Sequence, residues 1–179
     1  LKSLEKEGFE VTYLPVDEDG LISLEDLKNA IKDTTILITI MFANNEIGTI
    51  EPIEEAAKIA KEKGITFHTD AVQAIGAVKI NVHEMGIDML SLSAHKFNGP
   101  KGMGALYIRK GLRINNFING GAQESGRRAG TENTPGIIGL SYALEKATAG
   151  IDEKVKKLTA LRDYAIEEIE KTIPYCRLN

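Results

Sequence analysis

A lysine directly follows an apolar run in the stretch SLSAHKFNGPKGMGALYI, residues 91–108. A lysine at the end of a strand is usually solvated, because its ammonium group is costly to bury. The residues before Lys96 are strongly apolar, however, and the NGPKG segment after it lacks bulk. A lysine partly withdrawn from water can form Schiff bases with carbonyl compounds. Lys96 is therefore either a solvated loop residue or an amine held in a pocket for carbonyl chemistry.

Two further polar side chains, Asp70 and Gln73, follow an earlier apolar run in the segment HTDAVQ. Asp70 either caps a short helix that the sequence predicts next, or faces a cationic ring nitrogen. Gln73 lies three residues further on, on the same face of such a helix. His68 alternates with Asp70 along the strand and fits a packed strand histidine as well as a ligand.

Two loops add candidate groups. The segment ANNEIG has the composition of a turn, but the Asn45 amide could instead donate to a ligand oxygen. The loop GGAQESGRRAGTEN, residues 120–133, is either solvated or an ordered functional loop. In the second case Arg127, Arg128 and Thr131 would suit a phosphate or carboxylate group.

Neither a metal site nor a nucleotide loop is predicted. His68, Asp70 and His95 lack a metal-ligand spacing such as HxxxH or CxxC. The segment GPKGMG does not match GxxxxGK[ST], and its glycines instead favour a tight turn beside a ligand.

The elements that must position these residues alternate between strand-like and helix-like patterns. This alternation predicts an α/β fold with a mostly parallel sheet and helices on both faces. In such sheets ligands bind beyond the carboxyl ends of the strands, where three of the polar groups lie. We expect strands at 9–16, 34–43, 65–70, 87–95 and 104–110, the last antiparallel, and helices at 24–31, 51–64, 72–78, 134–150 and 151–173.

Composition narrows the class of protein. A chain of 179 residues with 42% hydrophobic and 27% charged residues is long enough for a real core. A formal charge of −4 gives no support for nucleic-acid binding, and no apolar stretch is long enough to span a membrane. Cys176 is the only cysteine, so no internal disulfide can form, and a reducing, cytoplasmic location is expected.

Taken together, the motifs resemble the fold-type I pyridoxal-phosphate enzymes of aminotransferase class V. Within these enzymes the chain is similar to the NifS/IscS-type cysteine desulfurases. The segments that carry the resemblance, in register over nearly the whole chain, are MFANNEIGTIEPI, FHTDAVQAIG, DMLSLSAHKFNGPKGMGALYIRK and GGAQESGRRAGTENTPGIIG.

The resemblance implies a role for each candidate residue. Lys96 matches the lysine that bonds to pyridoxal phosphate and then acts as a base, and Asp70 matches the aspartate paired with the pyridine nitrogen. The other matches are cofactor contacts: Asn45 and Gln73 near the ring oxygen, Ser93 and His95 at the phosphate, and Thr131 at the phosphate of the neighbouring subunit. Shared sites of this kind imply a homodimer. His68 lies in a family-typical segment, without an assigned catalytic role.

The implied activity is removal of sulfur from L-cysteine, which leaves L-alanine and an enzyme persulfide. The sulfur then reaches an iron–sulfur scaffold or another acceptor protein, for cluster and thio-cofactor synthesis. Two alternatives stay open: another class V enzyme, such as a selenocysteine lyase or an aminotransferase, and a non-catalytic domain that keeps the fold.

The resemblance also implies that the chain is an internal fragment. Residues 1–150 match the C-terminal part of the cofactor-binding large domain, and residues 151–179 match the first helix of a truncated small domain. The upstream phosphate-binding turn, the sulfur-accepting cysteine and the substrate arginine would lie outside the chain. Cys176 does not match that cysteine and is expected to be a small, semi-buried residue. We therefore expect the chain alone to have little or no desulfurase activity.

Overall fold

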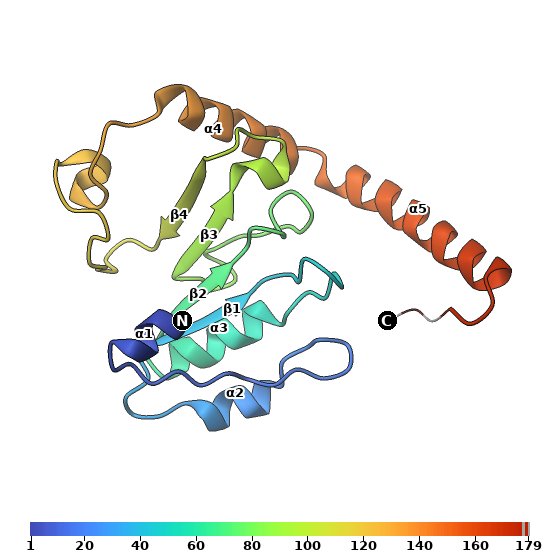
Figure 1. Cartoon of the computed structure of the whole chain (residues 1–179), viewed down its shortest axis with the longest axis horizontal. Helices are drawn as coiled ribbons and strands as arrows, with labels where there is room; N and C mark the ends of the chain where they lie inside the picture. The colour runs from blue at the N-terminus through green and yellow to red at the C-terminus, as the bar shows by residue number, and fades with distance from the viewer. Residues whose placement is uncertain (177, 179) are drawn as a thin grey trace.

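The computed structural model describes residues 1–176 and 178 and contains a four-stranded sheet in the order β1-β2-β3-β4. Its strands are β1 (Leu37–Met41), β2 (Thr66–Asp70), β3 (Met89–Ser93) and β4 (Gly104–Ile108) (Figure 1). The first three strands are parallel, and β4 is antiparallel to β3. The predicted mostly parallel sheet and its antiparallel last strand are confirmed.

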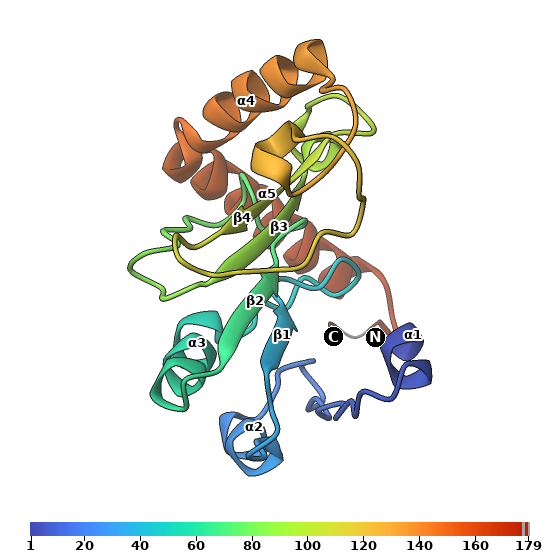
Figure 2. The same ribbon diagram turned by 90° about the vertical axis from the view of Figure 1, so that its left-hand side faces the viewer.

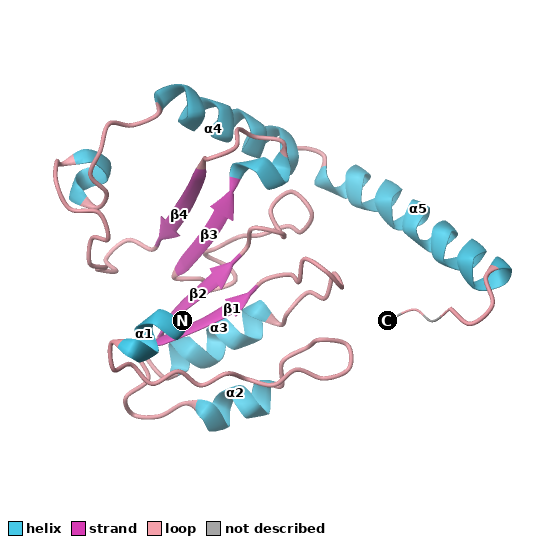
Figure 3. Cartoon of the chain, in the orientation of Figure 1, coloured by secondary structure: helices cyan, strands magenta, loops and turns pink. Residues whose placement is uncertain are grey.

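The described residues also form five α-helices and two short 3₁₀ turns (Figure 3). Ser23 caps the second helix by accepting a hydrogen bond from the Asp26 amide at 3.1 Å. Asn133 caps the fourth in the same way, with Pro135 in its first turn. The helices are α1 (Lys2–Lys6), α2 (Leu24–Ala30), α3 (Ile53–Glu62), α4 (Thr134–Thr148) and α5 (Ile151–Thr172), and the 3₁₀ turns are η1 (Ala94–Phe97) and η2 (Gln123–Gly126).

The main core lies between the sheet and the α2–α3 pair, which covers one sheet face (Figure 2). Phe67 of β2 and Ile53 of α3 are almost completely buried there. Burial alternates along β1, so Ile38 and Ile40 face this core while their neighbours face the other side. The opposite face therefore carries a different set of side chains, and Thr66, His68 and Asp70 of β2 belong to it.

Two expected elements are absent from the described residues. Residues 9–16 form no strand, and only a single bridge between Val16 and Ile22 involves them, so the predicted strand there is wrong. The segment has β-branched and aromatic residues, but none of the described strands pairs with it. The helix predicted at 72–78 is also wrong: successive turns replace it, and Gly76 adopts a positive φ of 76° that ends any helical run.

The fifth helix is attached to the rest of the chain by its first turn. Ile151 is 7% exposed, and the Lys154 ammonium donates to the Gly76 carbonyl at 2.8 Å. A surface ion pair of 2.6 Å joins Lys79 to Asp152. Beyond this turn, α5 extends away from the sheet (Figure 1).

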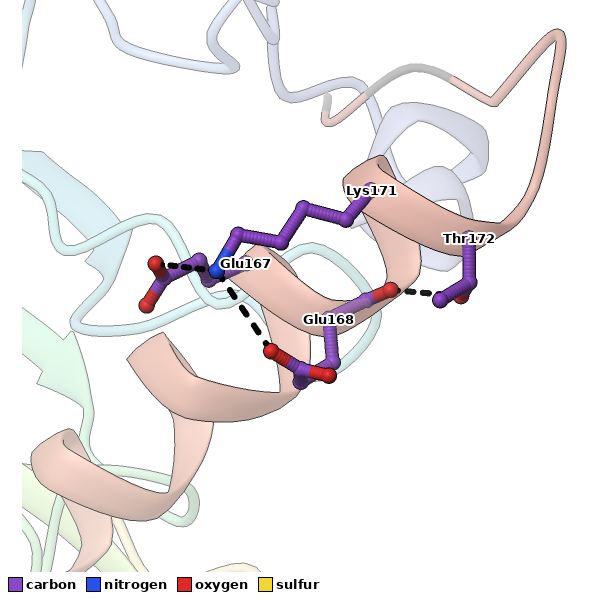
Figure 4. Close-up of polar contacts among 4 residues, drawn as sticks. All are labelled: Glu167, Glu168, Lys171 and Thr172. Atoms are coloured by element: carbon purple, nitrogen blue, oxygen red, sulfur yellow. Dashed lines mark hydrogen bonds and ion pairs between the residues drawn. The ribbon is translucent and has the colours of Figure 1, made fainter.

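Apolar residues recur at helical spacing along α5, but those beyond its first turn do not enter a core. On the outer turns the helix is solvated, and Lys171 pairs there with Glu167 at 2.6 Å and Glu168 at 3.5 Å (Figure 4). The assignment of residues 151–179 to a second domain stays a prediction. The exposed apolar residues of α5 at this spacing are Val155 (40%), Leu158 (53%), Leu161 (55%) and Ile169 (46%).

None of the helices in the described part of the chain has the length and apolar character needed to cross a membrane.

Candidate cofactor site

Three polar groups lie at the carboxyl ends of neighbouring parallel strands. The turn carrying Asn45 follows β1, Asp70 ends β2, and η1, with His95 and Lys96, follows β3 (Figure 1). Because β1, β2 and β3 are parallel and adjacent, these ends share one edge of the sheet. The structure thus confirms that the strand-end groups gather at one edge.

Asp70 is fixed firmly at this edge by both neighbouring strands. Its carbonyl accepts from the Phe42 amide at 2.8 Å, and the next amide, that of Ala71, donates to the Ser91 carbonyl at 3.0 Å. The carboxylate accepts through Oδ1 from the Val72 amide at 3.0 Å. Within residues 1–176 and 178, no lysine, arginine or histidine forms an ion pair with Asp70. The carboxylate is therefore anchored by one oxygen and available to a cationic ligand through the other.

Lys96 combines an exposed amine with a well-anchored backbone. Its neighbours Ala94 and Phe97 are 0% and 3% exposed and belong to a second apolar cluster with α4. Asn98 ends the turn in the left-handed conformation, with a φ of 65°. The Lys96 side chain makes no hydrogen bond or ion pair among the described residues. A well-anchored turn thus presents an accessible amine.

Ser93 and His95 form a pair beside this amine. The Ser93 hydroxyl lies 2.8 Å from His95 Nδ1, which fixes the imidazole ring at the entrance of η1. A hydroxyl and an imidazole N–H are both suitable donors to an anionic oxygen.

The turn after β1 contains two asparagines, one that stabilises the turn and one whose side chain is free to bind a ligand. Asn44 accepts through Oδ1 from the Glu46 amide at 2.8 Å and the Ile47 amide at 3.2 Å, as turn asparagines commonly do. Asn45 is exposed, and its side chain bonds to none of the described residues. Gln73 is half-buried in the turns after β2, not on the expected helix.

Thr131 is the one candidate that the structure does not bring to the strand ends. It is exposed in the long loop between β4 and α4, which lies beside β4 in Figure 1. This loop is ordered by contacts of its own: Asn116 Nδ2 donates to the Gly126 carbonyl at 2.5 Å, and Glu124 and Ser125 adopt positive φ angles of 50° and 57°. Strained backbone of this kind often marks functional loops.

Sequence reasoning named His68 but missed its two partners on the neighbouring strands, Thr39 and Ser91. His68 Nδ1 lies 2.7 Å from the Thr39 hydroxyl, and Nε2 lies 2.8 Å from the Ser91 hydroxyl. Burial lowers the pKa of His68, while the nearby Asp70 carboxylate acts in the opposite direction with a smaller effect. A polar residue on each of three successive strands, Thr39, His68 and Ser91, was the signal that could have identified this row.

These side chains match the functional groups of one kind of ligand. A carboxylate suits a protonated ring nitrogen, an exposed amine suits an aldehyde, and Ser93 and His95 suit a phosphate. An aromatic aldehyde that carries a phosphate and a basic ring nitrogen, such as pyridoxal phosphate, fits this donor set.

The fold and this edge define an α/β protein with a candidate ligand site at the carboxyl ends of its parallel strands. More specifically, the chain belongs to the aminotransferase class-V family, which it matches over residues 1–179.

Individual relatives agree with this assignment. The chain is 62% identical over 176 residues to "Cysteine desulfurase IscS" of Clostridium botulinum (strain Hall), covering 98% of this chain and 44% of the relative. A solved structure described as "NIFS-LIKE PROTEIN" superposes with a TM-score of 0.91 at 44% identity, covering 95% of this chain and 47% of that one. Another, "SspA in complex with cysteine", has a TM-score of 0.78 at 50% identity, covering 80% of this chain and 42% of that one. The chain therefore spans less than half the length of the proteins it matches.

Proposed function

We propose that this chain is part of a pyridoxal-phosphate-dependent cysteine desulfurase, which releases sulfur from L-cysteine and leaves L-alanine. The observation that carries the proposal is the position of Lys96 and Asp70 on adjacent strand ends, one as a free amine and the other as an anchored carboxylate. The identity to relatives named cysteine desulfurase supports the choice of reaction. A related structure described as a complex with cysteine supports the choice of substrate.

In this proposal each strand end binds one part of the cofactor. Asp70 would hold the ring nitrogen and favour its protonated form, because an opposite charge stabilises a cation. Asn45 and Gln73 would bind the ring oxygen, and Ser93 and His95 would donate to the phosphate. When bound, pyridoxal phosphate supplies an electron sink for the α-carbon of an amino acid.

Lys96 has two successive tasks. Its amine would hold the aldehyde of the bound cofactor. Once released by the amino group of cysteine, the same amine would act as a general base toward the α-proton of the substrate. The short, glycine-containing turn after Lys96 leaves the amine exposed for both tasks.

The sulfur leaves cysteine by transfer to a protein thiolate. Cys176 is exposed in the structure, so the expectation of a semi-buried residue is wrong. The resemblance does not match Cys176 to that thiolate, and its thiol, beyond the end of α5, donates to the Ile173 carbonyl at 3.1 Å. We therefore assign the persulfide to another cysteine of the complete enzyme. An iron–sulfur scaffold or another acceptor protein in the cytoplasm then takes the sulfur.

We also propose a homodimer in which Thr131 binds the phosphate held by the second subunit. The loop that carries Thr131 presents Phe117, which is 97% exposed, and Ile118, which is 42% exposed. Exposed apolar side chains next to a strained, polar loop are suited to a protein contact.

Absorbance spectroscopy tests the proposal. The purified protein mixed with pyridoxal phosphate should show a visible absorbance band. Borohydride should abolish this band and leave the cofactor covalently attached, and Lys96→Ala should prevent the attachment. Lys101→Ala is the matched control, because Lys101 is an exposed lysine in the same turn region. Attachment that persists in Lys96→Ala, or its absence from the unaltered protein, would contradict the assignment.

A further inference from the structure

A row of polar side chains beside Asp70 extends across three strands. Thr39 of β1, His68 of β2 and Ser91 of β3 are joined by contacts of 2.7 Å and 2.8 Å through the two nitrogens of the imidazole ring. Both ring nitrogens thus have a partner, and each partner is a hydroxyl that can donate or accept. The ring is held from two sides and has little freedom to rotate.

The strand register shows that this ring leans toward Asp70. Thr39 is the direct cross-strand partner of His68, whereas the direct partner on β3 is Met89. The ring instead contacts Ser91, which is the cross-strand partner of Asp70. The imidazole therefore reaches from its own level to the level of the carboxylate.

His68 and Asp70 also share a sheet face. Phe67 and Thr69 are buried on the α3 side, so the alternating residues His68 and Asp70 point the other way. Asp70 keeps only one carboxylate contact, the Val72 amide at 3.0 Å, among the described residues. Its orientation therefore also depends on what fills the space below it.

We propose that His68 is a positioning residue for Asp70. Thr39 and Ser91 hold its ring beside the Asp70 carboxylate, on the side of the amino ends of the strands, so that the ring orients the carboxylate without forming an ion pair with it. This inference rests on the proposed function, in which Asp70 binds a cationic ring.

The charge of the ring agrees with this role. Burial lowers the pKa of His68, and the one opposing charge is Asp70 itself, since the facing residues of β1 and β3, Thr39 and Ser91, are neutral. The imidazole is therefore uncharged at neutral pH. An imidazolium at this place would pair with Asp70 and compete with the cationic ligand.

The affinity of the cofactor-depleted protein for pyridoxal phosphate tests the proposal. His68→Phe keeps an aromatic ring but removes both hydroxyl contacts, so it should raise the Kd about tenfold. His68→Gln should keep most of the affinity, because an amide supplies one donor and one acceptor. His83→Phe is the matched control, since His83 lies on the turn before β3, at the opposite edge of the sheet, and should leave the Kd unchanged.

A double-mutant cycle separates positioning from general support of the fold. If His68 acts through Asp70, His68→Phe should have no further effect on the Kd once Asp70→Asn is present. An equal loss with and without Asp70→Asn would overturn the proposal. Should His68→Phe fail to fold, Thr39→Val and Ser91→Ala each remove one contact and enter the same cycle.

Nuclear magnetic resonance of the imidazole rings provides a readout without cofactor. The chain has three histidines, so variants of His83 and His95 assign the His68 signals. We expect a titration below that of an ordinary histidine, shifted lower still by Asp70→Asn. If the protein does not bind pyridoxal phosphate, the proposed function fails. If His68→Phe leaves the Kd for pyridoxal phosphate unchanged, or if Asp70→Asn leaves the titration of His68 unchanged, the positioning role is wrong while the proposed function stands.

Discussion

Asp88 and Arg109 connect the start of β3 to the end of β4, with Arg109 Nε donating to Asp88 Oδ1 at 2.5 Å. The second carboxylate oxygen accepts from the Phe67 amide of β2 at 2.9 Å. One carboxylate thus joins three strands at the edge of the sheet opposite the candidate site. The contact with Asp88 also raises the pKa of the Arg109 guanidinium.

Replacing this carboxylate should destabilise the fold. Asp88→Ala leaves the Phe67 amide and the guanidinium without their acceptor, so the free energy of unfolding should fall by about 1–3 kcal/mol. Urea denaturation measures the change. Asp152→Ala is the control, because its ion pair with Lys79 is exposed and should contribute less than about 1 kcal/mol. Equal losses in both variants would show that the buried amide contact has no special weight.

A second substitution should stabilise the protein. The Thr69 hydroxyl is completely buried, and no group within the described residues accepts or donates a hydrogen bond to it. Thr69→Val has a similar shape and removes the unpaired hydroxyl, so we expect a gain of about 1 kcal/mol in the free energy of unfolding. Thermal and urea denaturation check this gain. Thr66→Val, on the half-buried opposite face of β2, should change stability little.

The site was more predictable than the elements around it. Strand order and direction follow from alternation along the chain, and parallel neighbours must end at one edge, so Asn45, Asp70 and Lys96 could be grouped from the sequence. Alternation along the chain could not show whether residues 9–16 form a strand. Strand formation needs a partner edge, which local composition does not reveal.

Burial on α5 shows the same limit. Leu158 and Leu161 recur at the spacing of a packed helix face, yet they are 53% and 55% exposed in the structure. Periodicity predicts the helix and its apolar face correctly, but it does not say what covers that face. The contacts of His68 were hidden for a related reason, because cross-strand pairs depend on register.

The turn after Lys96 should tolerate no added side-chain atom at Gly99. A Cβ there would lie 2.8 Å from the Ala94 Cβ and 3.0 Å from the Ala94 carbonyl, so η1 would have to shift. Because η1 carries Lys96, Gly99→Ala should reduce the amount of pyridoxal phosphate that borohydride attaches to the protein, even under conditions where the variant stays folded.

Gly102→Ala is the matched control for this effect. It meets open space, but its φ of 80° makes the substitution cost about 1 kcal/mol of stability. Cofactor attachment should then stay near that of the unaltered protein. The reverse ranking of the two variants in attachment would contradict a role for Gly99 in positioning Lys96.

The stability of the protein should depend on the protonation of His68 in weak acid. Its pKa is lowered in the folded protein, mainly by burial, so the unfolded chain binds the proton more readily. The uncharged ring therefore contributes to the stability of the folded protein. This contribution is fully present above about pH 6.5, the ordinary histidine pKa, and is lost as the pH falls through the lower pKa of His68 in the folded protein. His68→Gln cannot take up the proton, so its free energy of unfolding should fall less than that of the unaltered protein between about pH 7 and pH 5. Urea denaturation at a series of pH values measures both curves. His83→Gln is the control, and a pH dependence that His68→Gln leaves unchanged would show that His68 is not the titrating group.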